Sequence, residues 1–323
     1  MNVVITGGAG FLGKRLAREL LRRGTLAGSS GSQERLDRIV LLDVVAASDF
    51  DDPRIQAIAG DIADASVARA VIDGRVASVF HLAAVVSAEA ERDFDLGMRV
   101  NVDAARILLE ACRRGNQRPR VLFTSSVAVY GGELPEVVTD STALEPRSSY
   151  GLQKAIGELL LSDYTRRGFV DGRVARLPTI SVRPGRPNQA ASSFASGIIR
   201  EPLNGEDAIC PVSKNLRLWL LSPRRAIECL IALHDAPGEA LGNKRAVNLP
   251  GLSVSVAEMV DALRTVGGDS SVARIRWERD DAIERIVGSW PGAWDTSRAR
   301  ALGLSADADF ESVVRAYVED ELH

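Results

Sequence analysis

The residues best suited to chemistry in this sequence are Tyr150 and Lys154, which stand four positions apart at the expected start of a helix. Because an α-helix completes one turn in about 3.6 residues, both side chains share one face and the lysine ammonium can reach the region of the phenol. A nearby cation favours the phenolate, which lets a tyrosine exchange protons with a substrate hydroxyl at ordinary pH. Ordinary amphipathic helices also begin with this spacing, so the surrounding segments must decide between the two interpretations.

Ser126 is the second candidate, at the end of the apolar run 121–124 that precedes the Tyr150 helix. This run predicts a buried strand, which would carry Ser125 and Ser126 to the carboxyl edge of a sheet, where ligands bind in doubly wound folds. A serine hydroxyl there can hold the substrate oxygen that the tyrosine deprotonates. Strand-end serines are common, so Ser126 gains significance only from the helix that follows.

A dinucleotide site is predicted at the start of the chain. The β-branched run from Asn2 to Thr6 meets a glycine-rich turn with the spacing Gly-x-x-Gly-x-x-Gly, and leucines then recur at helical spacing. Gly7 and Gly10 permit a tight turn and close approach of the backbone to a pyrophosphate, and Gly13 lets the helix pack against the strand. The amides at the helix N-terminus then face the anion. The alternative is a tight turn without a ligand.

The next apolar strand, 39–42, ends in Asp43. Its carboxylate can accept hydrogen bonds from the adenosine ribose hydroxyls. No arginine follows directly, and a carboxylate repels a 2′-phosphate, so we predict NAD rather than NADP. A strand-end aspartate that only caps a turn is the alternative. The Gly- and Ser-rich segment 24–33, which precedes this strand, is expected to be a flexible surface loop.

Further polar residues follow other predicted strands. Asp61 could accept a hydrogen bond from the adenine amino group, and Asp64 is expected to cap the next helix. The strand 76–82 contains His81, which we expect to be structural, and leads into small alanines that allow the backbone to lie against a cofactor. Asn101 is expected to open the following helix.

Composition indicates a soluble globular protein. Acidic and basic residues are interspersed at a net charge of −3, which argues against a nucleic-acid partner. The 3 cysteines are widely separated, as expected of buried thiols in a reducing compartment, and the 3 histidines lack metal-ligand spacing. An apolar strand begins directly after Asn2 and no apolar run reaches transmembrane length, so we expect a cytoplasmic protein without a metal or membrane partner.

The alternation of strands and helices predicts an α/β fold, a doubly wound parallel sheet with a smaller C-terminal substrate lobe. We expect an NAD-binding domain over residues 1–180, with returns near 218–250, and a mainly substrate-binding lobe over 181–323. Within the lobe, Ser255 is expected to cap a helix, with Glu258 at the capping-box spacing.

In their order along the chain, these motifs resemble the extended short-chain dehydrogenase/reductase family, the NAD-dependent epimerases and dehydratases. The resemblance is specific up to about Arg183 and looser beyond it. It rests on Thr6-Gly7-x-x-Gly10-x-x-Gly13, Asp43, Gly60-Asp61-Ile62, His81-Leu82-Ala83-Ala84, Asn101, Ser126-x-x-Val129-Tyr130-Gly131 and Tyr150-x-x-x-Lys154.

The resemblance implies a Rossmann-type fold and a homodimer built from the helices that begin near Asn101 and Tyr150. It also implies catalytic roles for Ser126, Tyr150 and Lys154, with Asn101 supporting a proton-relay water and Lys154 holding the nicotinamide ribose. The predicted NAD-binding residues are Gly7, Gly10, Phe11, Leu12, Gly13, Asp43, Asp61, Ile62, Leu82, Ala83, Ala84, Asn101, Tyr150, Lys154, Leu177, Thr179 and Ile180.

The C-terminal part departs from the nucleotide-sugar enzymes of this family, which commonly carry Arg-Asp-Phe or Arg-Asp-Tyr followed by Val-x-Asp. Here the corresponding segment 217–223 keeps the arginine and loses the acidic residues. The segments 183–194 and 200–205 instead resemble a subgroup of dehydrogenases that act on D-erythronate. One arginine with small hydroxyl and amide side chains can satisfy such a four-carbon sugar acid. The candidate substrate-binding residues are Ser87, Ser126, Tyr150, Thr179, Asn188, Ser192, Ser193 and Arg217.

The leading hypothesis is NAD-dependent oxidation of the C2 hydroxyl of D-erythronate, or of a close small sugar acid, to the 2-oxo acid. Tyr150 would be the base, Ser126 would orient the oxygen, and Lys154 would favour the phenolate and fix the cofactor. One alternative is a nucleotide-sugar epimerase or dehydratase that returns the hydride, against which the altered Arg217 segment argues. The other is a non-catalytic NAD-binding protein, which the intact catalytic residues disfavour.

Overall fold

The computed structural model describes residues 1–115, 117–185, 191–288 and 290–322. The chain forms two compact units, each with a hydrophobic core of its own. Unit 1 comprises Met1–Tyr130, Leu144–Arg176 and Cys229–Val247, and unit 2 comprises Gly131–Ala143, Leu177–Glu228 and Asn248–His323. Over the described residues, no helix is both long enough and apolar enough to span a membrane.

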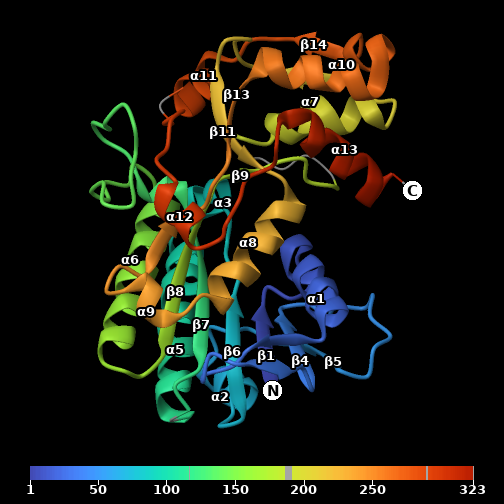
Figure 1. Cartoon of the computed structure of the whole chain (residues 1–323). Helices are drawn as coiled ribbons and strands as arrows, with labels where there is room; N and C mark the ends of the chain where they lie inside the picture. The colour runs from blue at the N-terminus through green and yellow to red at the C-terminus, as the bar shows by residue number, and fades with distance from the viewer. Residues whose placement is uncertain (116, 186–190, 289, 323) are drawn as a thin grey trace. The chain divides into compact units, whose positions relative to one another are not determined.

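Unit 1 is built on a sheet whose described strands number 7, in the order β12-β8-β7-β6-β1-β4-β5 (Figure 1). The strands are β1 (Asn2–Thr6), β4 (Arg38–Asp43), β5 (Ile55–Ala59), β6 (Val76–His81), β7 (Arg120–Ser126), β8 (Asp171–Leu177) and β12 (Ala246–Asn248). The pairs β1–β4, β1–β6, β4–β5 and β6–β7 run parallel. The predicted doubly wound α/β sheet is therefore confirmed, and its strand order reverses between β1 and β6, the place where such sheets bind ligands.

The helices of unit 1 cover a sheet whose central strand is buried on both faces, since Val3 to Thr6 are all inaccessible to solvent. One face packs against α2, α5 and α6, and Figure 1 shows α5 and α6 side by side. The helical segments are α1 (Phe11–Arg23), α2 (Ala65–Val71), α3 (Ser87–Arg92), α4 (Phe94–Gly97), the π-helical η1 (Met98–Asp103), α5 (Ala104–Gly115), the 3₁₀ turn η2 (Val127–Val129), α6 (Ser149–Arg166) and α9 (Gly238–Leu241). α8 (Pro223–Asp235) begins in unit 2 and ends in unit 1.

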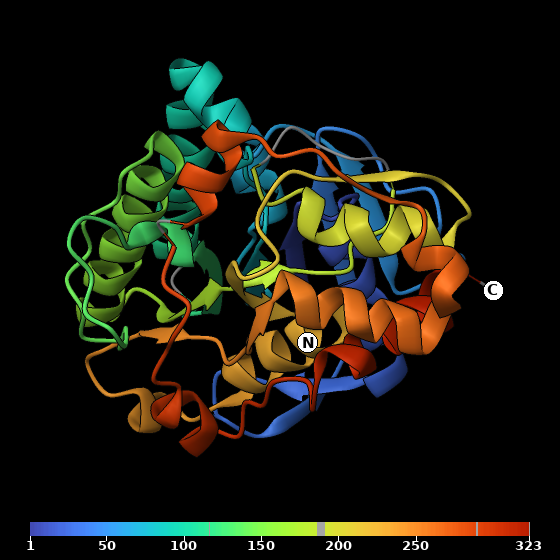
Figure 2. The same ribbon diagram turned by 90° about the horizontal axis from the view of Figure 1, so that it is seen from above.

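Unit 2 is a smaller α/β body with its core among α7, α10 and α13, and Figures 1 and 2 both show α7 and α10 next to each other. The predicted capping box is confirmed, because Ser255 accepts the amide of Glu258 and the Glu258 carboxylate accepts the amide of Ser255. The elements are β9 (Thr179–Ile180), β10 (Ala208–Cys210), β11 (Arg217–Leu221), β13 (Leu252–Ser255), β14 (Ile275–Trp277), α7 (Phe194–Leu203), α10 (Val256–Val272), α11 (Asp281–Gly288), α12 (Ser297–Ala301) and α13 (Phe310–Glu321).

The expectation of a flexible surface loop at 24–33 is wrong. Its ends form the antiparallel strands β2 (Thr25–Ala27) and β3 (Gln33–Arg35), and Leu26 and Ala27 are buried. Gly24 ends α1, and the other glycines and the serines occupy the turn between the two strands. The Asp235 carboxylate holds this hairpin by accepting the amide of Ala27 at 3.0 Å and the side-chain amide of Gln33 at 3.2 Å. Because Asp235 is far from the hairpin in the sequence, the composition of residues 24–33 does not indicate this contact.

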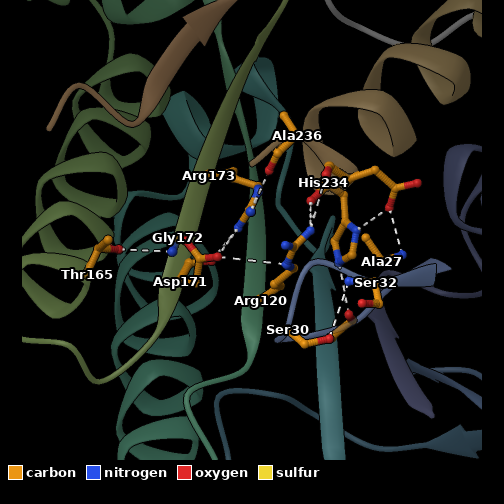
Figure 3. Close-up of polar contacts among 12 residues, drawn as sticks. Ala27, Ser30, Ser32, Arg120, Thr165, Asp171, Gly172, Arg173, His234 and Ala236 are labelled. Atoms are coloured by element: carbon orange, nitrogen blue, oxygen red, sulfur yellow. Dashed lines mark hydrogen bonds and ion pairs between the residues drawn. The ribbon is translucent and has the colours of Figure 1, made fainter. Parts of the chain in front are cut away.

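A buried polar network lies at the amino ends of β7 and β8 (Figure 3). The predicted site is at the carboxyl ends of the strands. Arg120, the first residue of β7, donates to the carbonyl of His234, and the fully buried Arg173 donates to the carbonyls of Asp171 and Ala236. The bonds to His234 and Ala236 satisfy carbonyls at the C-terminus of α8 that the helix itself leaves without partners. The network therefore fastens the end of α8 to the sheet.

His234 is fully buried in this network and neutral. Its Nδ1 lies 3.0 Å from an Asp235 carboxylate oxygen and its Nε2 lies 2.9 Å from Ser78 Oγ. Since a carboxylate only accepts, a neutral ring donates to Asp235 and accepts from Ser78. Burial lowers the pKa of His234 to about 4, against the opposing effect of its bond to Asp235. Burial and the charge of Lys154 similarly lower the pKa of His81 to about 3.

We predict that acid destabilises the protein through these histidines. The unfolded chain takes up a proton at His234 below an ordinary pKa of 6.5, whereas the folded protein takes it up only near pH 4. The stability contributed by the neutral form is therefore complete above pH 6.5 and lost as the pH falls through about 4. In denaturant titrations at several pH values, His234→Gln should show a shallower decline over this window than the wild type, by up to about 1.4 kcal/mol per pH unit. Parallel declines would contradict the assignment.

Candidate active site

The glycine turn after β1 requires glycine at two of its positions. Gly7 has φ +71°, and a Cβ there would lie 2.8 Å from the amide nitrogen of Ala83, at the end of β6. A Cβ at Gly13 would lie 2.1 Å from the carbonyl oxygen of Gly7. The missing side chains thus allow β1, α1 and the segment after β6 to meet closely, which places Leu82, Ala83 and Ala84 beside the glycine turn.

The N-terminus of α1 is suited to an anion. Among the described residues no side chain caps this end at Gly10, and the first turn, which contains Phe11 and Leu12, carries no acidic residue. Its amides therefore have no acceptor within the helix, and the helix dipole is positive there. These features fit the pyrophosphate of a dinucleotide.

Asp43 is held beside this turn by two backbone amides. Its carboxylate oxygens accept the amide of Ala9 at 3.0 Å and the amide of Val44 at 2.8 Å. A carboxylate has about four acceptor positions, so others remain for ribose hydroxyls. The contact of Asp43 with the ribose stays a prediction, for which these acceptor positions are available.

Asp61 and Ile62 are placed differently. The Asp61 carboxylate accepts the amide of Ala63 at 2.8 Å and forms an ion pair with Arg99, whereas Ile62 is buried in the core of unit 1. An adenine contact from Asp61 stays a prediction, and such a contact would involve a carboxylate that already has a cationic partner.

Asn101 does not open a helix, contrary to the expectation. It lies inside the π-helical segment η1, which continues from α4 into α5. Its amide group accepts from the nitrogen of Val85 at 2.9 Å and donates to the Val85 oxygen at 3.1 Å and to Gln153 at 2.7 Å. These bonds fasten the segment after β6 to α6 through a buried side chain. Local widening of a helix into π form is frequent at functional sites, and no local sequence pattern announces it.

Ser126 and the start of α6 are brought together by the absence of a side chain at Gly151. The Ser126 hydroxyl accepts the amide of Ala128 at 3.1 Å, and the Ser148 hydroxyl caps α6 by accepting the amide of Gly151 at 3.1 Å. A Cβ at Gly151 would lie 2.1 Å from the carbonyl oxygen of Ala128. The helix that carries Tyr150 therefore begins directly against the turn that follows Ser126.

Lys154 is buried among groups that stabilise its charge. Its ammonium donates to the carbonyl of Thr124 at 2.9 Å, and its nitrogen lies 4.9 Å from the ring centroid of Phe123 and 5.7 Å from that of Tyr150. Burial lowers the pKa of Lys154 to about 8, although the negative charge of Glu158 acts in the opposite direction. The cation predicted near Tyr150 is therefore present and mostly protonated at neutral pH.

The sequence interpretation missed the network behind Lys154. Glu158 and Arg176 form a buried ion pair, with Arg176 Nη2 2.6 Å and Nε 2.9 Å from the two carboxylate oxygens. Ser125 also donates to Glu158, and Arg176 donates to the hydroxyl of Tyr130. These bonds connect α6, the end of β7 and β8. The only signal in the sequence was an acid one helical turn after Lys154, which also fits an exposed helix face.

We predict that Glu158→Gln destabilises the protein by about 3–5 kcal/mol, because it leaves the buried guanidinium of Arg176 without a balancing charge. Asp163→Asn is a matched control, since Asp163 pairs with Arg166 on the exposed face of the same helix. It should change the free energy of unfolding by about 0.5 kcal/mol or less. Equal effects of the two variants in denaturant titrations would contradict the role assigned to the pair.

The remaining predicted residues belong to other segments of the chain. Ser87 is the first residue of α3 in unit 1. Arg217, on β11 in unit 2, donates to the Ser253 carbonyl at 2.6 Å and lies 3.4 Å from the Glu258 carboxylate. Asn188 lies outside the described residues. The other predicted residues of unit 2 are Leu177, Thr179, Ile180, Ser192 and Ser193. In the described ranges, no group of His, Cys, Asp or Glu side chains could hold a metal ion.

Comparison with known proteins places this geometry in context. The model of the NAD dependent epimerase/dehydratase family matches residues 3–226. A protein of Cupriavidus necator described as a D-erythronate dehydrogenase is 63% identical over 99% of this chain and 98% of its own length. One of Haemophilus influenzae with the same description is 46% identical over 100% of both chains. A solved structure from Agrobacterium tumefaciens, described as a nucleoside-diphosphate-sugar epimerase, has a TM-score of 0.94 at 43% identity and covers 100% of this chain and 94% of that one.

Proposed function

Because the chain belongs to the NAD-dependent epimerase/dehydratase family and so uses a nicotinamide cofactor, we propose that it oxidises the C2 hydroxyl of D-erythronate to the 2-oxo acid with NAD. The observation that carries the proposal is the 63% identity, over 99% of the chain, to a protein described as a D-erythronate dehydrogenase. The relative that is 46% identical carries the same description. The glycine turn, Asp43 and the arrangement around Lys154 provide the groups that this chemistry needs.

In this mechanism Tyr150 removes the proton of the C2 hydroxyl as its phenolate, while the hydroxyl of Ser126 holds the same oxygen. Lys154 stabilises the phenolate through its charge, and its neighbours Phe123 and Thr124 keep the ammonium fixed. A bound nicotinamide would supply the acceptor for the C2 hydride, so that the alcohol would become a ketone while its hydroxyl proton passes to Tyr150. Asn101 contributes by holding the segment at Val85 in place.

The substrate's carboxylate and remaining hydroxyls need partners, for which the candidates are those named from the sequence. Thr179, Ser192, Ser193 and Arg217 remain proposals, as do Asn188 and Ser87. Arg217 is exposed and bound to Ser253, so it would have to exchange that bond for a substrate carboxylate. Charge-assisted bonds of this kind are strong and bidentate, which favours the exchange.

We predict that Tyr150→Phe lowers kcat at least about 100-fold, because the base is removed while the ring remains. The assay follows the absorbance of reduced cofactor after mixing protein, NAD and D-erythronate. Tyr164→Phe, which removes another hydroxyl from the same helix, is the control and should retain activity. Failure of the wild-type protein to reduce NAD with any four- or five-carbon aldonate would overturn the proposed function.

The second candidate is a nucleotide-sugar epimerase, which the description of the Agrobacterium tumefaciens structure favours. Such an enzyme returns the hydride to its substrate and accumulates no reduced cofactor. It would also bind nucleoside diphosphates and gain thermal stability from them. A thermal-shift series with nucleoside diphosphates, run beside the aldonate assay, distinguishes the two candidates.

We also propose a homodimer formed through α5 and α6. Leu152 and Leu159 stand seven positions apart, on one face of α6, and their exposed fractions are 45% and 67%. Two such leucines on one helix face are suited to burial against a second copy of the chain.

Leu159→Glu should convert the dimer to a monomer, because it places charge on the apolar face of α6. The molar mass measured by light scattering after gel filtration checks this. Ile209→Glu is the control, since Ile209 is a similarly exposed apolar residue (54%) in unit 2. A monomeric wild type, or a dimeric Leu159→Glu variant, would refute this interface.

A further inference from the structure

The loop after Asp43 is fastened to α1 by an ion pair that the proposed mechanism does not use. The ammonium of Lys14 lies 2.6 Å from an Asp49 carboxylate oxygen, and Arg18 Nη2 lies 3.8 Å from the same oxygen. The Ser48 hydroxyl donates to the other oxygen at 2.9 Å. Lys14 and Arg18 are four residues apart, so both cations project from one face of α1 toward one carboxylate.

These cations belong to the part of unit 1 that would surround the adenosine ribose. Lys14 directly follows Gly13 in the first turns of α1. Asp43 is tied to the same turn through the amide of Ala9, and the chain runs from Asp43 through the exposed Val44 and Val45 to Asp49. The loop thus starts at one carboxylate and carries a second at Asp49, and both carboxylates bind the glycine turn or the helix that follows it.

The 2′-substituent of the ribose distinguishes NAD from NADP. A hydroxyl at this position donates to a carboxylate, whereas a phosphate is repelled by it and needs a cation such as lysine or arginine. Lys14 and Arg18 have the required chemistry and lie close to the turn, but Asp49 neutralises them. The hydrogen bond from Lys14, followed by that from Ser48, lowers the pKa of Asp49, so its charge persists at neutral pH.

We propose that Asp49 is a second specificity-determining residue for the cofactor, which excludes NADP by holding Lys14 and Arg18 away from a 2′-phosphate. Asp43 repels the phosphate directly, and Asp49 removes the cations that would compensate. This inference rests on the proposed use of NAD and deepens it. It predicts that Lys14 and Arg18 form a latent 2′-phosphate site, which Asp49 blocks by pairing with both cations.

The test measures the dissociation constants of NAD and NADP by calorimetry with the purified full-length protein at low salt, where surface charges are least screened. Asp49→Asn should lower the ratio of the NADP constant to the NAD constant about tenfold, because a freed ammonium can form a charge-assisted bond to phosphate. Lys14→Gln combined with Asp49→Asn should restore most of the original ratio. The pair is exposed, so loss of Asp49 should leave the fold intact, which the thermal midpoint of each variant verifies.

Asp51→Asn is the matched control, since Asp51 is an exposed acid of the same loop, without an ion pair among the described residues. It removes the same charge and should leave the ratio unchanged. An equal fall in the ratio for Asp51→Asn, or no fall for Asp49→Asn, would overturn the inference. A wild-type protein that binds neither cofactor, or prefers NADP, would instead overturn the proposed use of NAD. The two failures are therefore distinguishable.

Discussion

The buried ammonium of Lys154 is the interaction on which the organisation of unit 1 depends. A cation withdrawn from water must be surrounded by acceptors and compensating charge, or it loses its proton. Here a backbone carbonyl of β7, two aromatic rings and, one helical turn away, Glu158 meet that requirement. Glu158 is itself buried and needs Arg176, which in turn uses Tyr130. The need to stabilise the buried charge of Lys154 thus determines how α6, β7 and β8 are joined. It also places Ser126 at the end of β7 and Tyr150 at the start of α6, which these contacts connect.

The two edges of the sheet serve different purposes. At the carboxyl edge, polar side chains hold three of the connections: Asp43 holds the glycine turn, Asn101 holds the segment after β6, and Lys154 holds the end of β7. At the amino edge, Arg120 and Arg173 satisfy carbonyls at the end of α8, and Asp235 supports the β2–β3 hairpin. The predicted ligand-binding residues of unit 1 gather at the first edge because helix N-termini and strand ends point there, whereas the second edge carries a buried polar network.

The proposed dehydrogenase differs from its epimerase relatives in the step that follows hydride transfer, and not in the catalytic base. The same tyrosine and lysine serve a dehydrogenase and an epimerase, since both begin by removing a hydroxyl proton. Under the proposed function, the outcome depends on the substrate that is bound and on whether the reduced cofactor leaves. In the proposed reaction, Arg217 would exchange its bond to the Ser253 carbonyl for the carboxylate of a small substrate.

The sequence by itself determined the sheet, the glycine turn, the helix caps at Asp64 and Ser255, and the likeness to a family of nicotinamide-dependent enzymes. These features depend on residues close together in the chain, where periodicity, glycine and capping side chains act locally. Only the tertiary structure decided the hairpin at 25–35, the π-helical position of Asn101, the Glu158–Arg176 pair and the contact of Asp49 with Lys14. Each depends on a partner brought near by folding. A glutamate one turn after a lysine has the same local pattern whether it faces solvent or a buried arginine, and only packing resolves the difference.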